Sequence, residues 1–247
     1  MSDYSNSARE ARREVLTLIH KAGTSHIASN FSVIDIASVL YENLEEGDEV
    51  VWSKGWAAAT IYYFLRKQGK ITREQLESFP NAPFYGLAEV FVPGVHVSGG
   101  SMGQGLGVAI GMALGKKRAG EGGNIFCIMS DGEMQEGTTW EGALLAGHHK
   151  LNNLIVLVDY NKWTAMGMTK DVSELSPLDR KWNAFGFSTC EIDGHNHKDI
   201  EAALLSSRFS FQPKAIVCHT VKGKGVKNFE NKILYHYKNV DSEEYAK

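Results

Sequence analysis

Short apolar runs alternate with amphipathic stretches along this chain, and the two patterns have different periods. The runs have the length of buried strands, whereas the stretches between them space apolar residues three or four positions apart, as helices do. Strands are predicted over 125–130, 154–160, 187–192 and 214–221, with a shorter apolar run at Val50–Trp52. Helices are predicted over 7–21, 32–43, 55–68, 73–78, 103–119, 133–150 and 197–208. This alternation predicts an α/β fold, a three-layer, doubly wound and mostly parallel sheet with helices on both faces.

Two segments lack such periodicity. Residues 79–100 are rich in Pro and Gly and predict an ordered loop, and residues 239–247 predict a solvated tail. The predicted helix over 103–119 contains several glycines, which lower helix propensity. We therefore expect a neighbouring helix or a bound cofactor to pack closely against it. No internal repeat or low-complexity linker interrupts the 247 residues, so a single domain over 1–247 is predicted.

Composition argues against several classes of protein. The formal net charge of -3 and the pI of about 6.3 give no basic patch, which disfavours nucleic-acid binding. No segment has the roughly 18 consecutive apolar residues of a membrane span, and the polar N-terminus lacks the apolar core of a signal peptide. Cys127, Cys190 and Cys218 lie far apart, mostly inside apolar runs. They indicate buried free thiols in a reducing cytoplasm rather than zinc ligands or disulfides.

Two predicted strands end beside residues that suit a cation. The strand over 125–130 is followed by Asp131, and the strand over 154–160 is followed by Asn161. Ligands of open α/β sheets bind at the carboxyl ends of the strands, and Mg²⁺ prefers carboxylates together with phosphate oxygens of a ligand. Asp131 and the side-chain oxygen of Asn161 could therefore share a cation with a diphosphate. For an isolated pair, capping residues of turns would be the favoured interpretation.

A diphosphate also needs backbone N–H groups or cationic side chains. Gly132 has no Cβ, so its N–H at a helix N-terminus could approach a phosphate closely. The backbone carbonyl near Trp163 could give the cation a third oxygen ligand. Lys222 and Lys224 could approach a phosphate or remain solvated loop charges, and the sequence favours neither interpretation.

Three longer segments accompany this motif. SKGWAAATIYYFL spans 53–65, a glycine-rich segment spans 93–117, and CHTVKGKGVKNFENKILYH spans 218–236. With Ser130-Asp131-Gly132 and, after 28 intervening residues, Asn161, they resemble the N-terminal, diphosphate-binding half of a transketolase, as found in split transketolases made of two subunits. The resemblance covers nearly the whole chain. It implies the diphosphate-binding (PP-type) domain of the thiamine diphosphate-binding fold.

The resemblance implies how the cofactor and its metal would be held. Asp131, Asn161 and the carbonyl of Trp163 would bind Mg²⁺ or Ca²⁺. Gly132 would contact the diphosphate of thiamine diphosphate. His236 matches a family histidine that reaches both the diphosphate and the substrate, which makes it a candidate catalytic and cofactor-binding residue.

Further matching residues receive roles in the same way. Gly100 and Met102 would present backbone groups to the aminopyrimidine and support the bent cofactor. His26 would line the substrate channel as a catalytic residue. Glu136, also a candidate catalytic residue, and Glu141 match acidic residues that face the subunit interface and couple two active sites.

The chain departs from the family at three positions. Trp56 and Ala82 replace family histidines that line the active site, and His96 stands where Glu is common. A site that binds a donor hydroxyl rejects donors lacking it, so losing polar groups suggests a donor such as pyruvate in place of a ketose phosphate. Alternatively, His96 folds back and substitutes for a lost histidine.

The resemblance also implies a partner. The family's pyrimidine-binding domain, whose Glu activates thiamine diphosphate, has no counterpart in this sequence. We therefore expect a C-terminal transketolase-like subunit that carries it, in an α₂β₂ heterotetramer acting on a small-molecule donor and acceptor. The expected activity is that of a cytoplasmic transferase of carbohydrate metabolism that moves a two-carbon ketol or acetyl unit.

Three alternatives remain open. The first two are the α subunit of a 2-oxo acid dehydrogenase and a non-catalytic regulatory or scaffold subunit. The third is a Rossmann nucleotide-binding protein, which is weaker because Gly103-Gln104-Gly105-Leu106-Gly107 lacks the GxGxxG spacing.

Overall fold

The centre of the molecule is one five-stranded parallel sheet. The computed structural model describes residues 4–246. The strands are β1 (Glu49–Trp52), β2 (Ile125–Ser130), β3 (Leu154–Tyr160), β4 (Ser188–Asp193) and β5 (Lys214–His219). They lie in the order β1-β2-β3-β5-β4, and every neighbouring pair is parallel. The predicted sheet is confirmed, and all the paired strands within 4–246 run in the same direction.

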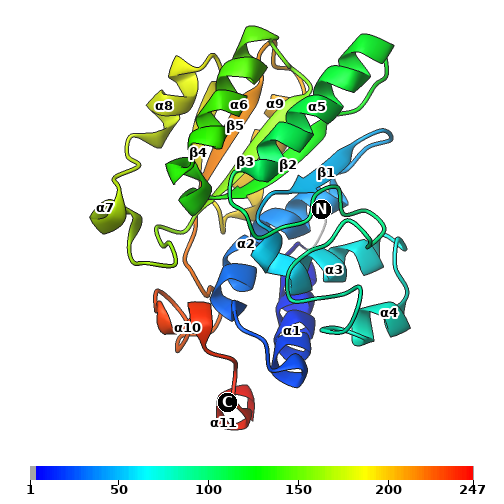
Figure 1. Ribbon diagram of the computed structural model, residues 1–247, viewed down its shortest axis with the longest axis vertical. Helices are drawn as coiled ribbons and strands as arrows, with labels where there is room; N and C mark the ends of the chain where they lie inside the picture. The colour runs from blue at the N-terminus through cyan, green and yellow to red at the C-terminus, as the bar shows by residue number, and fades with distance from the viewer. Residues whose placement is uncertain (1–3, 247) are drawn as a thin grey trace.

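Helices cover both faces of this sheet. Figure 1 shows α5, α6 and α8 in front of the strands and α9 behind them, with α1 to α4 gathered below. No helix within residues 4–246 is long and apolar enough to span a membrane. The helices are α1 (Tyr4–Ala22), α2 (Ile27–Glu42), α3 (Ala58–Lys67), α4 (Arg73–Glu77), α5 (Gln104–Ala119), α6 (Gly137–His148), α7 (Thr169–Val172), α8 (Leu178–Ala184), α9 (His197–Ser207), α10 (Leu234–Tyr237) and α11 (Ser242–Ala246), with short 3₁₀ helices η1 (Gly55–Ala57) and η2 (Asp131–Gln135).

The core is divided into two halves by the sheet. In β2, Cys127 and Met129 pack with α5, α6 and α8, whereas Phe126 and Ile128 pack with α1, α2, α3 and α9. Successive residues of a strand point to opposite faces, so a strand covered on both sides must be apolar throughout. This is why the strands appear in the sequence as continuous apolar runs.

The glycines of α5 are explained in part by close packing. A Cβ on Gly105 would lie 2.5 Å from the Cα of Ser53, just after β1. The partner helix α6 approaches through Gly142, where a Cβ would lie 3.1 Å from Ile110. The expectation of a close neighbour is therefore correct at Gly105. A Cβ on Gly107 or Gly111 would meet no atom of the described residues within 4 Å, and packing within this chain does not explain them.

Several predicted boundaries differ from the structure. The helix predicted from 32 begins at Ile27, as α2, and two further differences have local reasons. The helix predicted from 133 begins at Gly137, because η2 comes first and Glu133 completes a capping box with Ser130. The predicted solvated tail contains α11, whose Tyr245 ring stacks on His20 with centroids 4.3 Å apart. Lys247 lies outside the described residues. The loop predicted over 79–100 contains no regular helix or strand, as expected.

Candidate active site

A pocket opens at the carboxyl edge of the sheet, where four chain segments meet. The segments are those that follow β1, β2, β3 and β5. The sides are closed by the first turns of α2, by the glycine-rich loop before α5 and by α10. The carboxyl edge is where parallel sheets bind ligands. The lining residues are Ser29, Ser53, Lys54, Gly55, Trp56, Gly100, Ser101, Met102, Ser130, Gly132, Glu133, Asn161, Trp163, Thr164, Ala165, Lys222 and His236.

Asp131 lies at the floor of this site and is completely buried. Its Oδ1 accepts the N–H of Gly132 at 2.9 Å, and its Oδ2 accepts the N–H of Lys162 at 2.5 Å. Burial, followed by the nearby carboxylate of Asp159, raises the pKa of Asp131 to about 7. Within residues 4–246 no lysine or arginine forms an ion pair with it. Asp131 is therefore a carboxylate short of positive charge.

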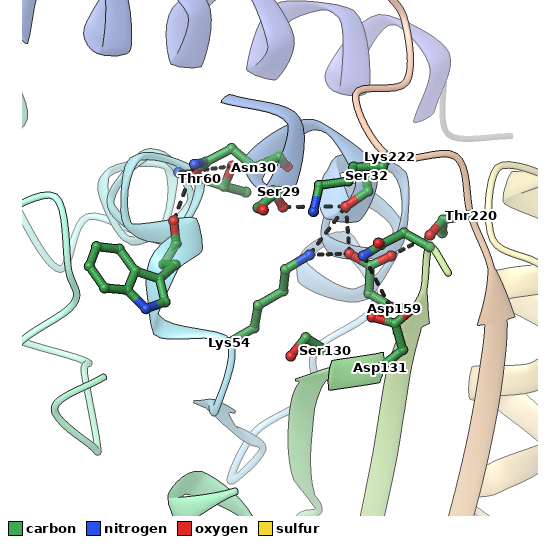
Figure 2. A network of polar contacts seen from close by, with 12 residues as sticks. Ser29, Asn30, Ser32, Lys54, Thr60, Ser130, Asp131, Asp159, Thr220 and Lys222 are labelled. Atoms are coloured by element: carbon green, nitrogen blue, oxygen red, sulfur yellow. Dashed lines mark hydrogen bonds and ion pairs between the residues drawn. The ribbon is translucent and has the colours of Figure 1, made fainter. Parts of the chain in front are cut away.

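Asp159, in β3 two residues before Asn161, is a buried carboxylate that does have a cationic partner. Its carboxylate forms a buried ion pair with Lys54 and accepts hydrogen bonds from the hydroxyls of Ser32, at 2.6 Å, and Thr220. Figure 2 shows this network between the strand ends and α2. Burial would raise the pKa of Asp159, but the Lys54 ammonium and these hydrogen bonds hold it below its usual value. Lys54 is thus neutralised inside the protein.

Lys222 is the second buried lysine at the pocket, with 1% of its surface exposed. Its Nζ lies 3.1 Å from Nδ1 of His236, and no ion pair joins it to a carboxylate within residues 4–246. Burial, followed by the Lys54 charge, lowers the pKa of Lys222 to about 8, so the side chain is mostly a cation at neutral pH. The pocket therefore contains an ammonium group that its own side chains do not neutralise.

His26 and Trp56 form one wall. Their rings stack with centroids 4.3 Å apart and an interplanar angle of 10°, and Trp56 is 41% exposed. The buried amide of Asn30 donates to the carbonyls of both residues, at 3.0 and 3.3 Å. Burial, then the charge of Lys222, lowers the pKa of His26 to about 4. The wall presents a neutral imidazole backed by an indole.

Glu133 is a site residue that the sequence interpretation missed. Its buried carboxylate accepts hydrogen bonds from the Ser53 hydroxyl, from the N–H of Ser130 at 2.8 Å and from the N–H of Gly103 at 3.2 Å. It therefore ties the ends of β1 and β2 to the start of α5. The capping-box spacing from Ser130 to Glu133 was the available signal, but it does not reveal the two distant partners.

Most residues implied by the family resemblance are brought together. Gly100, Met102, Gly132, Asn161, Trp163 and His236 line the pocket, and Asp131 and His26 lie against it. Glu136, half-buried, and Glu141, exposed, are on or beside α6 and outside the lining. Ala82 is exposed and is also outside the lining.

The structure contradicts the alternative in which His96 folds back into the site. Its Nε2 lies 3.2 Å from the carboxylate of Glu49, at the amino end of β1. The pocket lies beyond Trp52, at the other end of that strand. His96 therefore replaces neither of the two missing family histidines.

The donor set fits an oxygen-bound cation and a diphosphate. Asp131 supplies a carboxylate, Asn161 an amide oxygen that accepts only the N–H of Trp163, at 3.1 Å, within the described residues, and Trp163 a backbone carbonyl. Such all-oxygen sets suit Mg²⁺ or Ca²⁺. The structure places no group of three or more His, Cys, Asp or Glu side chains within 4–246 that could hold a metal. A cation here would depend on the amide and carbonyl oxygens and on its ligand.

The doubly wound sheet and its charged edge pocket define an α/β domain that binds an anionic cofactor. The chain belongs to the transketolase family: residues 5–247 match the family described as "Transketolase, thiamine diphosphate binding domain". It is therefore a thiamine diphosphate-binding chain in a family of transferases, as the resemblance implied.

Three similar proteins support this assignment. The chain is 34% identical over 255 aligned positions to the transketolase family protein y4mO of Sinorhizobium fredii, covering 97% of this chain and 91% of that protein. It is 34% identical to the 6-deoxy-6-sulfo-D-fructose transketolase subunit SqwG of a Clostridium species, covering 95% and 90%. The transketolase structure from Leishmania mexicana aligns with all of this chain and 40% of its own, at 26% identity and a TM-score of 0.92.

Proposed function

We propose that this chain is the diphosphate-binding subunit of a two-subunit transketolase that transfers a two-carbon ketol unit, using thiamine diphosphate and Mg²⁺. The observation that carries the proposal is that Asp131 and Lys222, two buried ionisable groups at one pocket, form no ion pair within residues 4–246. A metal ion would satisfy the carboxylate and a diphosphate would satisfy the ammonium. The relatives favour ketol transfer over the acetyl-transferring and 2-oxo acid dehydrogenase alternatives.

In this proposal the strand ends hold the metal and the diphosphate. Asp131, Asn161 and the Trp163 carbonyl would bind the cation, and the N–H of Gly132 would face a phosphate oxygen. Met102 lies close to Gly132, because a Cβ on Gly132 would be 3.5 Å from its sulfur. In this position Met102, together with Gly100, would support the organic part of the cofactor. When bound, thiamine diphosphate supplies the electron sink for carbon–carbon bond cleavage.

The two histidines would handle the substrate. The rings of His26 and His236 lie 4.5 Å apart, on the same side of the pocket as Lys222. Burial, followed by the charge of Lys222, lowers the pKa of His236 to about 3. Neutral imidazoles can both donate and accept hydrogen bonds, so they can bind donor hydroxyls and pass a proton without carrying a charge.

A partner subunit would complete the active site. SqwG is named a subunit, and the chain spans about 40% of the Leishmania transketolase. Leu144 and Leu145 on α6 are 62% and 46% exposed next to Glu141, as expected if α6 and Glu136 face another chain. We propose a cytoplasmic α₂β₂ assembly with a subunit that carries the pyrimidine-binding domain.

The test is a donor assay on the chain co-purified with that subunit. With thiamine diphosphate and Mg²⁺, we expect transfer of a two-carbon unit from a ketose phosphate to an aldehyde, and little activity with either chain alone. Release of carbon dioxide from pyruvate, without ketose cleavage, would contradict ketol transfer. Full activity in this chain alone would contradict the need for a partner.

Trp56 should affect how well the donor binds. Its indole fills the part of the pocket next to His26, where the family has a histidine. We expect Trp56→His to raise kcat/KM for a common ketose phosphate by about tenfold, because it restores a polar partner for a donor hydroxyl. Steady-state kinetics would check this, with Phe211→His, at a 90% exposed position before β5, as control. Equal values for Trp56→His and wild type would show that Trp56 does not restrict the donor.

A further inference from the structure

Lys222 contacts one particular ring nitrogen of His236, in addition to placing a positive charge near it. Its Nζ lies 3.1 Å from Nδ1 of the imidazole, and Figure 2 shows the side chain beside α2 and close to Ser29 and Ser32. An ammonium group has three N–H donors and no acceptor. The Nδ1 atom must therefore be the acceptor, which means that it carries no proton.

The backbone holds Lys222 in this position from both sides. The N–H of Asn231 donates to the Lys222 carbonyl at 2.9 Å, and the N–H of Gly223 donates to the carbonyl of Ala28 at 3.0 Å. The preceding N–H, of Val221, donates to Nε2 of His195 at 2.8 Å. These hydrogen bonds hold the loop that carries Lys222 in place, so the ammonium group has a fixed position in the pocket.

His236 is held independently of Lys222. The next residue, Tyr237, donates its hydroxyl to the carbonyl of Ala165 at 2.6 Å, which ties α10 to the segment after Asn161. The Ser29 hydroxyl lies 3.4 Å from Nδ1 and can either donate or accept. Ser29 alone would therefore permit either tautomer, whereas Lys222 permits one.

We propose that Lys222 is a positioning residue that fixes His236 as the neutral tautomer with its proton on Nε2, so that the ring presents an N–H donor to a ligand in the pocket. Within residues 4–246 Nε2 has no hydrogen-bond partner. The low pKa of His236 agrees with a neutral ring. Only the identity of the ligand, a phosphate or hydroxyl oxygen of the cofactor or donor, rests on the proposed function.

Loss of Lys222 should change the tautomer rather than the fold. In Lys222→Met, the ring could place its proton on Nδ1 and donate to Ser29, leaving a lone pair on Nε2 facing the ligand. Lys224→Met is the matched control, because Lys224 is two residues away and outside the pocket lining. Lys222→Arg retains a charged donor and should restore part of the wild-type behaviour.

Nitrogen-15 NMR of the full chain at neutral pH reads the tautomer directly, with His236→Asn used for assignment. We expect a protonated Nε2 and a bare Nδ1 in the wild type and in Lys224→Met, and a shift toward protonated Nδ1 in Lys222→Met. A proton on Nδ1 in the wild type, or an unchanged His236 signal in Lys222→Met, would overturn the inference.

Kinetics of the assembled enzyme distinguish this inference from the proposed function. Lys222→Met should lower kcat/KM at least about tenfold, the effect of losing a hydrogen bond that involves a charged group, and Lys222→Arg should recover part of the loss. An active wild type with an equally active Lys222→Met would defeat the inference and the diphosphate contact of Lys222, while ketol transfer by the complex would stand. If the wild type shows no ketol transfer, the proposed function fails, and the NMR result still decides the tautomer.

Discussion

One face of α2 serves two clusters of buried charge, and they are built differently. Ser29 lines the pocket and Ser32 donates to Asp159 beside it, and one turn further along the helix Asp35 faces a second cluster. The Asp35 carboxylate lies 2.5 Å from Arg12, 2.7 Å from His195 and 3.0 Å from His197. That cluster contains its own opposite charges.

The pocket does not contain an opposite charge in contact with each of its buried charged groups. Burial would raise the pKa of Asp35, but hydrogen bonds from His195, His197 and Arg12 hold it far below its usual range. Asp131 is equally buried but has no such partners, and burial raises its pKa to about 7. The comparison indicates that the Asp35 cluster joins elements of the fold, whereas Asp131 and Lys222 are left for a ligand.

The largest effect should come from removing the uncompensated carboxylate. Asp131→Ala should lower the activity of the assembled enzyme more than about 100-fold, beyond what loss of a residue supporting a metal ligand usually costs. The folded chain should persist, because the variant removes a buried charge with no ion-pair partner among the described residues. Activity assays and circular dichroism would measure both.

The control for this change is Asp171→Ala, at an exposed position on α7. It should leave activity and folding as in the wild type. If Asp131→Ala retains most of the activity, Asp131 does not hold the metal. If it unfolds the chain, Asp131 acts as Asp35 does, and the contrast between the clusters is wrong.

Breaking the Asp35 cluster should reduce stability instead. Asp35→Asn removes the charge that pairs with Arg12 and the acceptor that His195 and His197 contact, and removing one member of a buried ion pair costs about 3 kcal/mol. Urea denaturation would measure the free energy of unfolding. Glu77→Gln, in the exposed pair of Glu77 with Arg73 at 2.7 Å, should change it by less than about 0.5 kcal/mol. Equal effects of the two substitutions would show that the Asp35 cluster does not stabilise the fold.

A smaller effect concerns pH. The pKa of His26 falls from its ordinary 6.5 to about 4 in the folded chain, and that of His236 falls to about 3. Between pH 6.5 and 4 the unfolded chain therefore binds more protons at these two histidines than the folded one, which lowers stability as the pH is lowered. Asp131, whose pKa is raised to about 7, binds a proton in the folded chain over the same window and opposes part of this effect. Asp35 contributes little, because its pKa is lowered and its contribution is lost only below its ordinary 3.8.

We expect the two pocket histidines to lower stability by about 4 kcal/mol between pH 6.5 and 4.5 and Asp131 to offset about 2 kcal/mol of this, which leaves a net loss of about 2 kcal/mol. Urea denaturation at several pH values would measure the slope. In the double variant His26→Asn, His236→Asn stability should no longer fall as the pH is lowered, because only the opposing effect of Asp131 remains, whereas the exposed His148→Asn should behave as the wild type does. An equally steep slope in the double variant would assign the effect to other groups.

Local patterns predicted the sheet and the floor of the pocket. The apolar runs gave the strands, and Asp131 and Asn161 directly follow two of them, so their proximity follows from a parallel sheet. Glu133 was missed because Ser53 and Gly103, two of its partners, are far away in the sequence.

Other features depend on tertiary contacts that no local pattern records. Lys222 and Lys224 lie on either side of Gly223 in the sequence, and only the fixed loop places one of them in the pocket. His96 lies in the loop over 79–100, which has no period to indicate where a side chain points. The short polar helix α11 depends on Tyr245 stacking against His20.

The most direct test of the central claim is calorimetric titration of the full chain with inorganic pyrophosphate, with and without Mg²⁺. The uncompensated charges of Asp131 and Lys222 predict saturable binding that requires Mg²⁺ and is lost in Asp131→Ala. Binding of the same strength without Mg²⁺, or unchanged in Asp131→Ala, would contradict the claim that this pocket holds a metal-bound diphosphate.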